Sequence, residues 1–171
     1  MASGRSVRLL VVHETQNAAE EIANLLRNSG LPTQMTFIAS GSEFEQKLSQ
    51  SQWDLILVRN GLEILPTDNA IAVAKQAAPQ SPIIVLVDEL DDMQCGQWFK
   101  RGASDVCEEE YDAILLNRMR FYIESFHSKL DIAELSVQLE ETEQRCQSML
   151  RSSKDAIAYV HGGMHIFYYI G

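Results

Sequence analysis

Five short strand-like runs, spaced along the first two thirds of the chain, constrain its fold more than any other feature. They are VRLLVV (7–12), TQMTFI (33–38), DLILV (54–58), PIIVLV (82–87) and SDVC (104–107). Between them lie amphipathic segments that predict helices over 16–30, 40–50, 69–78 and 91–102. This alternation with short connections predicts a parallel β-sheet with helices on both faces, a doubly wound α/β fold. In such sheets functional groups gather at the carboxyl ends of the strands.

The charge balance and the cysteines argue against several classes of function. The chain carries 24 acidic and 14 basic residues, a net charge of −10, and it has no basic run. We expect no nucleic-acid surface, because phosphate backbones are bound by clustered Lys and Arg. Cys95, Cys107 and Cys146 lack metal-binding spacing and are expected to be reduced thiols in the cytoplasm. No apolar run approaches the roughly 20 residues that span a bilayer, so we expect no membrane association.

A long helix is predicted over residues 111–150, which contain neither proline nor glycine. Its first part spaces apolar residues by three and four, and this seam is expected to cover the sheet to about residue 126: Leu116, Met119, Ile123, Phe126 and Leu130. After a slip in register a second seam follows: Ile132, Leu135, Leu139, Cys146 and Met149. Since a helix beyond residue 128 has no sheet left to cover, we expect this second seam to pair with the same helix of another copy, giving a homodimer.

Residues 152–171 differ in character from the long helix. The runs AIAYV (156–160) and MHIFYYI (164–170) flank His161, Gly162 and Gly163, a pattern typical of two strands joined by a hairpin turn. Two strands alone form only a marginal structure, so the segment is expected to begin another domain. The expected organisation is a first domain over 1–127, a helix over 128–151 that ends near Ser152, and the truncated start of a further domain over 152–171.

Four segments resemble the receiver domains of response regulators. LLVVHE (9–14) is similar to the first strand with its acidic pair, and DLILVR (54–59) to the strand that carries the phosphate acceptor. PIIVLV (82–87) is similar to the fourth strand, and RGASDVCEEEY (101–111) to the stretch that carries a lysine and a proline. The resemblance covers residues 7 to about 127. It implies a CheY-like, flavodoxin-like five-stranded sheet in the order 2-1-3-4-5, here with an extended C-terminal helix.

The resemblance also assigns positions to the receiver chemistry, in which a histidine kinase phosphorylates an aspartate beside Mg²⁺. The acidic pair corresponds to His13 and Glu14, the acceptor to Arg59, the phosphate-reading Thr or Ser to Val87, and the lysine to Glu109. Arginine cannot accept a phosphoryl group, and its charge repels a divalent cation. We therefore expect a degenerate site without catalytic residues, metal or cofactor.

The charges at two of these positions are exchanged relative to the family, with a cation at Arg59 and an anion at Glu109. We expect Arg59 to pair with Glu14, Glu109 or both, and so to hold one conformation. The alternative is that these are unrelated surface residues. A metal-ligand role for His13 beside Glu14 has no second ligand at helical spacing to support it.

Other aspartates have simpler interpretations. Asp88, Asp91 and Asp92 follow the fourth strand and are expected to begin the next helix, where acidic residues favour the helix dipole. Asp54 begins its strand, at the edge opposite to the predicted site, and is a poor substitute acceptor.

The opening RLLVVHETQNAAEEIANLLRNSG (8–30) and the late SSKDAIAYVHGGMHI (152–166) together resemble a narrower group, the FimX-type proteins. These carry a degenerate receiver, a PAS domain, and GGDEF and EAL domains linked to cyclic di-GMP. The resemblance implies downstream PAS, GGDEF and EAL domains in the same chain, control of type IV pili and twitching, and a protein partner at a cell pole.

The function expected from these features is a pseudo-receiver, without enzymatic activity, that works independently of phosphorylation. It would dimerise, localise and relay a signal to a downstream cyclic-di-GMP output module, and the resemblance implies that the parent protein is a cyclic-di-GMP receptor or phosphodiesterase. Two alternatives stay open: a sensor in which Arg59 binds an anion or small molecule, and a conventional phosphoaccepting response regulator.

Overall fold

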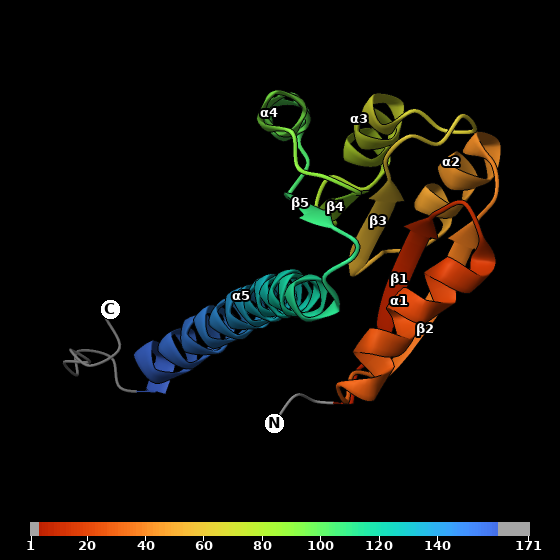
Figure 1. Cartoon of the computed structure of the whole chain (residues 1–171). Coiled ribbons are helices and arrows are strands. Elements are labelled where there is room, and N and C mark those ends of the chain that lie inside the picture. The colour runs from red at the N-terminus through yellow and green to blue at the C-terminus, as the bar shows by residue number, and fades with distance from the viewer. Residues whose placement is uncertain (1–3, 161–171) are drawn as a thin grey trace. The chain divides into compact units, whose positions relative to one another are not determined.

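The computed structural model describes residues 4–160 and contains one parallel sheet (Figure 1). Its strands lie in the order β2-β1-β3-β4-β5. They are β1 (Val7–Val12), β2 (Thr33–Ile38), β3 (Leu55–Arg59), β4 (Ile83–Val87) and β5 (Asp105–Glu108). Val12 lies opposite both Ile38 and Val58, and Arg59 lies opposite Leu86, so the strands end close together at one edge. The predicted α/β fold with strand order 2-1-3-4-5 is confirmed.

Helices cover both faces of the sheet. One face packs against α1 (Gln16–Asn28) and the first turns of α5 (Asp112–Val160). The other packs against α2 (Gly41–Gln50), α3 (Thr67–Ala77) and α4 (Asp92–Arg101). Along β1, Leu9 and Val11 face α1 and α5, whereas Leu10 and Val12 face α2 and α3. Because successive side chains of a strand point to opposite faces, a strand covered on both sides must be apolar throughout.

Capping side chains begin three of the helices. The Thr15 hydroxyl accepts a hydrogen bond from the N–H of Ala18 at the start of α1. The Ser40 hydroxyl accepts one from the N–H of Glu43 at the start of α2. Asp91 caps α4 and Asp92 is its first residue, as predicted. At the other end of α4, Gly102 has φ +114°, a left-handed conformation that glycine adopts without the penalty of a Cβ.

The chain divides into two units, Met1–His127 and Ser128–Gly171. In the first unit, α5 packs on the sheet through a seam of buried residues: Leu115, Met119, Ile123 and Phe126. Leu116, predicted at the first position of this seam, is half-buried and packs against the same core, whereas the fully buried Leu115 was not predicted. A step of one residue turns a helix by about 100°, so Leu115, four residues before Met119, points more directly at the sheet.

Asp54 lies at the base of the sheet, at the edge opposite to the strand ends. It is 4% exposed, and its carboxylate accepts a hydrogen bond of 2.7 Å from the backbone N–H of Arg8. Its other oxygen lies 3.2 Å from Nε2 of His127, the last residue of the first unit. Asp54 therefore joins β1, β3 and α5, a structural role that matches its predicted distance from the functional edge.

In the second unit α5 continues as a helix to Val160. The predictions that the helix ends near Ser152 and that residues 156–160 form a strand were wrong. No proline or glycine occurs between Tyr111 and His161, and Lys154, Asp155 and Ala156 do not break a helix. The second predicted strand, 164–170, lies outside the described residues. Within 4–160, no helix is both long enough and apolar enough to cross a bilayer.

Candidate functional site

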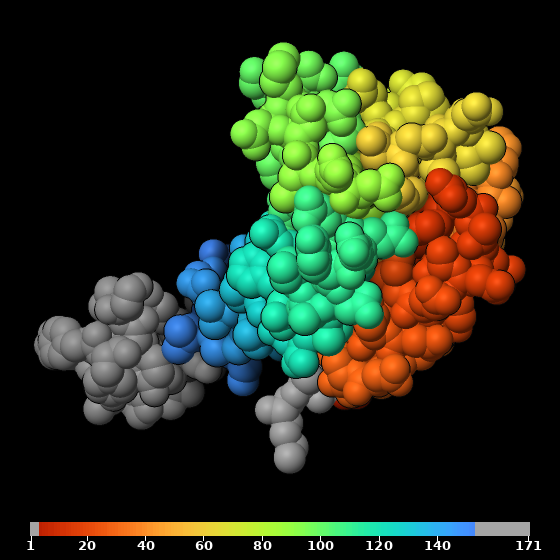
Figure 2. Space-filling view, viewed as in Figure 1, coloured from red at the N-terminus to blue at the C-terminus, as the bar shows by residue number. Residues whose placement is uncertain are grey.

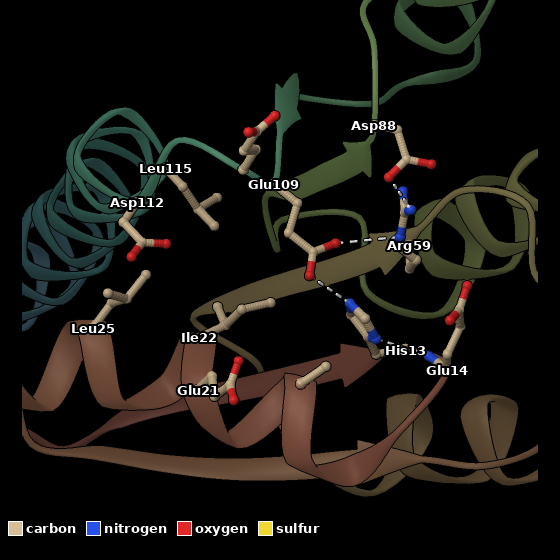
Figure 3. A pocket seen from close by; sticks show the side chains of 12 residues that line it. His13, Glu14, Glu21, Ile22, Leu25, Arg59, Asp88, Glu109, Asp112 and Leu115 are labelled. Atoms are coloured by element: carbon tan, nitrogen blue, oxygen red, sulfur yellow. Dashed lines mark hydrogen bonds and ion pairs between the residues drawn. The ribbon is translucent and has the colours of Figure 1, made fainter.

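The carboxyl ends of four strands bring the predicted site residues together. His13 and Glu14 follow β1, Arg59 ends β3, Asp88 follows β4, and Glu109 follows β5. Because the strands are parallel and nearly in step, these side chains converge on one cleft (Figure 3). The cleft, of about 730 Å³, is also bounded by α1 and by the start of α5.

His13 is held at the centre of this edge in one tautomer. Its side chain is 6% exposed, and Nδ1 accepts a 2.8 Å hydrogen bond from the backbone N–H of Glu14. Since Nδ1 accepts, the ring proton is on Nε2, which donates to Oε1 of Glu109 at 2.8 Å. Both ring nitrogens are therefore occupied by hydrogen bonds, which leaves neither free to bind a metal.

Arg59 completes the cluster from the neighbouring strand. Its side chain is 11% exposed, and Nε lies 3.2 Å from Oε2 of Glu109. Nη2 donates to Oδ1 of Asp88 at 2.5 Å, and Nη1 donates to the carbonyl oxygen of Leu86 at 3.3 Å. Nη1 and Nη2 thus each donate a hydrogen bond, Nε lies within ion-pair distance of Glu109, and Glu109 uses one oxygen for His13 and the other for Arg59 (Figure 3).

The two ion pairs of Arg59 differ in their exposure to water and so in their expected contribution to stability. Asp88 is 85% exposed, so water screens its attraction to Arg59, and an exposed pair of this kind contributes about 0–1 kcal/mol to stability. Glu109 is 27% exposed and also accepts from His13, so its geometry is fixed from two sides. The contacts His13–Glu109–Arg59 are therefore the part of the cluster that is better shielded from water.

Some of the residues predicted for the site take part in the cluster around Arg59, and others do not. Of the two carboxylates expected beside Arg59, Glu109 is there, whereas Glu14 joins the cluster through its backbone N–H. Val87 is 4% exposed and packs in the α3–α4 side of the core. Asp88 was predicted to begin a helix, and this was wrong, because it pairs with Arg59. The one signal in the sequence was that Asp88 directly follows the strand predicted over 82–87, and the register that sets Leu86 opposite Arg59 came from the structure.

The walls of the cleft are strongly acidic. Its lining contains six carboxylates: Glu14, Glu21, Asp88, Glu109, Glu110 and Asp112. Within residues 4–160, the same lining contains one guanidinium, that of Arg59, and apolar side chains such as Ile22 and Leu115. The cleft therefore repels anions over most of its surface.

No protein-family model matches the chain, and no curated protein matches it in sequence. Many solved structures match its fold. A signal receiver domain of an HD domain-containing protein from Pseudomonas fluorescens matches with a TM-score of 0.65 and 21% identity, over 77% of this chain and 96% of that one. A receiver domain of a sensor histidine kinase from Pseudomonas aeruginosa, with a magnesium ion in its active site cleft, matches with 0.60 and 20%, over 70% and 99%. A beryllofluoride-activated NtrC4 receiver domain, a dimer in solution, matches with 0.61 and 19%, over 70% and 98%.

The chain has the receiver fold. The solved receiver domains are covered almost completely, whereas 70–77% of this chain is matched. The chain is thus longer than these domains.

The residues at the magnesium position of a receiver do not suit that ion here. Mg²⁺ requires octahedral oxygen ligands, with carboxylates free to coordinate it. In this receiver fold Glu109 is already bonded to Arg59 and His13, and a guanidinium occupies the end of β3. Among the described residues, no group of three or more His, Cys, Asp or Glu side chains is arranged to hold a metal ion.

A second polar cluster joins β5 to α5 in the receiver unit. Asp105 is 7% exposed and bonds Nη1 of Arg118 at 2.5 Å, and the Tyr122 hydroxyl donates to the carbonyl oxygen of Ser104 at 2.9 Å. Burial raises the pKa of the Cys107 thiol beside this cluster, and the charge of Arg118 only partly opposes that effect. Burial likewise raises the pKa of Tyr122.

Cys107 is therefore expected to be an unreactive thiol. A raised pKa leaves less thiolate at any given pH, and the side chain is 3% exposed. In the folded chain at pH 8, we expect iodoacetamide to modify Cys107 at least about ten-fold more slowly than in the urea-unfolded chain. The rate should begin to rise at a higher pH than that of an exposed thiol. Peptide mapping by mass spectrometry measures this, and equal rates in the folded and unfolded chain would contradict the burial.

Proposed function

We propose that residues 1–127 form a pseudo-receiver, a receiver-fold domain that acts in signal transduction without being phosphorylated. It would act by pairing with a second copy and by positioning the domains that follow it. Receiver domains are generally signalling domains without enzymatic activity, and we propose the same for this chain. The observation that carries the proposal is the guanidinium of Arg59 at the end of β3, bonded to Glu109 and Asp88.

The chemistry of phosphoryl transfer supports this view of Arg59. An acceptor must offer a nucleophilic oxygen with a metal ion nearby to neutralise developing charge. At this position the chain has a group that is permanently charged and only donates hydrogen bonds. The carboxylate of Glu109, where the family has a lysine, is engaged from both sides.

The same bonds favour a single conformation of the strand ends. A phosphorylated receiver changes state when its phosphate recruits side chains from neighbouring strands, which requires those side chains to have two positions. Here Glu109 is hydrogen-bonded to His13 and ion-paired with Arg59, so the three side chains already have partners within the protein. We propose that the cluster holds the β1, β3 and β5 ends in a fixed arrangement, and that the information relayed is the position of the attached helix.

Dimerisation is proposed through the helix of the second unit. Its apolar side chains are exposed in the single chain, at 63% for Ile132, 63% for Leu135, 69% for Leu139 and 69% for Met149. Cys146 is also exposed. Helices in proteins gain most of their stability by packing an apolar face against another element. We therefore expect this helix, with its apolar residues exposed, to pack against a partner.

The wider context is proposed from the resemblance to FimX-type proteins alone. In that context the helix would lead to PAS, GGDEF and EAL domains in a longer cytoplasmic chain, and the pseudo-receiver would contribute to localisation at a cell pole. The cyclic-di-GMP chemistry and its link to type IV pili would then reside in domains outside residues 1–171.

The anion-sensor alternative is poorly supported by the cleft. The Arg59 guanidinium already donates two hydrogen bonds and is ion-paired with Glu109, and six carboxylates line the same space. An incoming anion would have to displace Glu109 or Asp88 and then face the remaining negative charges. A conventional phosphoacceptor is disfavoured by the lack of a carboxylate at the end of β3.

The test is phosphorylation by a small donor. We expect that incubation with acetyl phosphate and Mg²⁺ leaves the intact mass of this chain unchanged, because no free nucleophilic carboxylate meets a metal ion at the strand ends. A conventional receiver domain treated in parallel serves as the positive control and should gain one phosphoryl group. A hydroxylamine-labile adduct on any carboxylate of the cleft would overturn the pseudo-receiver proposal.

A further inference from the structure

The outward side of α5 carries apolar residues that the receiver unit does not use. In that unit Ile114 is 50% exposed and Phe121 is 62% exposed. The first turns of α5 lie at the molecular surface between α1 and α4 (teal in Figure 2). These side chains therefore point away from the sheet, opposite to the buried Met119 and Ile123.

A heptad count links these residues to the seam of the second unit. With Ile132 at position a and Leu135 at d, the count gives Leu139 and Cys146 at a and Met149 at d. Carried back along the sequence, the same count gives Ile114 and Phe121 at d without any slip. The sheet-facing Met119 and Ile123 fall at b and f, the positions that point away from a coiled-coil partner. The change of register predicted from the sequence therefore separates two seams on different sides of the same helix, one buried against the sheet and one exposed.

We propose that two copies of this chain pair in parallel and in register through α5, along a seam that begins on the receiver unit at Ile114 and Phe121 and continues through Ile132, Leu135 and Leu139. This rests on the proposed function, in which the helix dimerises, and adds its direction, its register and its extension onto the receiver unit. The occupant of the exposed seam is thus a second copy of the same helix.

Like-with-like pairing favours the parallel direction. The strongest apolar residues of the second unit lie early, at Ile132, Leu135 and Leu139, and Thr142 occupies the next d position. In a parallel dimer each residue of the seam faces its own copy, so apolar meets apolar and Thr142 meets Thr142. In an antiparallel dimer a positions face d positions, so Thr142 would face an apolar a residue such as Ile132 or Leu139 instead. Among parallel coiled coils, Ile at a with Leu at d, as at Ile132 and Leu135, is the combination that favours two strands.

Charge placement supports the same direction. Glu124 falls at g and Lys129 at the following e, and a parallel dimer brings g of one helix beside the next e of the other. The two-fold symmetry gives this contact twice, and each time Glu124 of one helix would lie beside Lys129 of the other. No acidic residue from 132 to 150 occupies an a or d position. Polar residues at Arg118, Ser125 and Ser128 interrupt the seam, and polar a positions are known to specify register. Arg118 already has a partner in its own chain, Asp105.

Cysteine cross-linking of the full chain tests the proposal. Native Cys146 lies at a, and two further chains would carry Phe121→Cys or Thr142→Cys, each combined with Cys146→Ser. In a parallel, in-register dimer all three positions face their own copies across the two-fold axis. An antiparallel dimer has one crossing point, so only a position close to that point can cross-link to itself. Gln144→Cys with Cys146→Ser is the matched control, because f points away from the partner.

Light scattering first establishes the dimer, and mild oxidation followed by peptide mapping then locates the disulfides. We expect all three positions to give at least about five-fold more self-cross-linked dimer than the Gln144→Cys control, because only a and d face the partner. A dimer with self-cross-linking at one position only, or with equal yield at Gln144→Cys, would overturn the parallel seam and leave the pseudo-receiver proposal intact. A monomer would overturn both the seam and dimerisation. A phosphorylated adduct in the acetyl phosphate assay would overturn the pseudo-receiver alone.

Discussion

Replacing Arg59 by aspartate is expected to lower the free energy of unfolding by about 2–4 kcal/mol. The substitution removes the cation from Glu109 and Asp88 and places a third carboxylate between them. Removing one partner of a fully buried ion pair costs about 3–5 kcal/mol, and the value here is lower because Glu109 is 27% exposed and Asp88 is 85% exposed. Urea unfolding of the full chain, followed by circular dichroism, measures the change.

Two further variants separate charge from packing at this site. Arg59→Met keeps much of the side-chain volume without adding a negative charge, and it should cost less than Arg59→Asp. The double variant Arg59→Asp with Glu109→Lys exchanges the two charges and should recover part of the loss, since opposite charges again face each other. Unchanged stability in Arg59→Asp would show that the cluster is not a structural network and that the selection of Arg59 has another cause.

Replacing Met119 by alanine is expected to cost about 2–5 kcal/mol of unfolding free energy, the usual range for deleting a large buried apolar side chain. Met119 is fully buried between α5 and the sheet, with Leu115 and Ile123 as neighbours on the same helix. A cavity at that position weakens the attachment of α5 to the receiver unit. Chemical unfolding at fixed protein concentration measures the loss.

The matched control is Leu139→Ala, on the same helix but 69% exposed in the single chain. Its effect should appear as weaker dimerisation and should depend on protein concentration, because the side chain contacts only a second copy in our proposal. If Leu139→Ala destabilised the monomer as much as Met119→Ala, or if Met119→Ala were neutral, the assignment of two separate faces to α5 would be wrong.

The fold was predictable because burial on two faces leaves a strong pattern. A strand such as β4, between β3 and β5 and covered by helices on both sides, must be apolar at every position, and it is. The caps at Thr15, Ser40 and Asp91 were likewise local signals that mark where helices begin. The end of α5 was harder to predict, because Ser152 and Ser153 permit either a cap or a continuing helix, and the local sequence does not decide between them.

The partners within the site depended on features that are not local. Arg59 had two acidic candidates by position, and the structure places Glu109 and Asp88 beside it. That outcome depends on which side each loop turns after its strand. For His13 the decisive fact is a hydrogen bond from the backbone of the next residue, which fixes the tautomer and so the direction of the bond to Glu109. Which side of α5 faces the sheet was not decided by the sequence for a related reason, since spacing by three and four is the same on any side of a helix.

The amino-acid sequence by itself determined the layered α/β architecture, the strand order implied by resemblance, and the presence of a cation where a receiver has its acceptor. These follow from residue type and short-range periodicity, which burial and charge impose on any chain. Only the tertiary structure decided which carboxylates Arg59 bonds, that both nitrogens of His13 are occupied, and which side of α5 faces the sheet. Those choices depend on the distances between side chains that are far apart in the sequence, and folding alone brings them together.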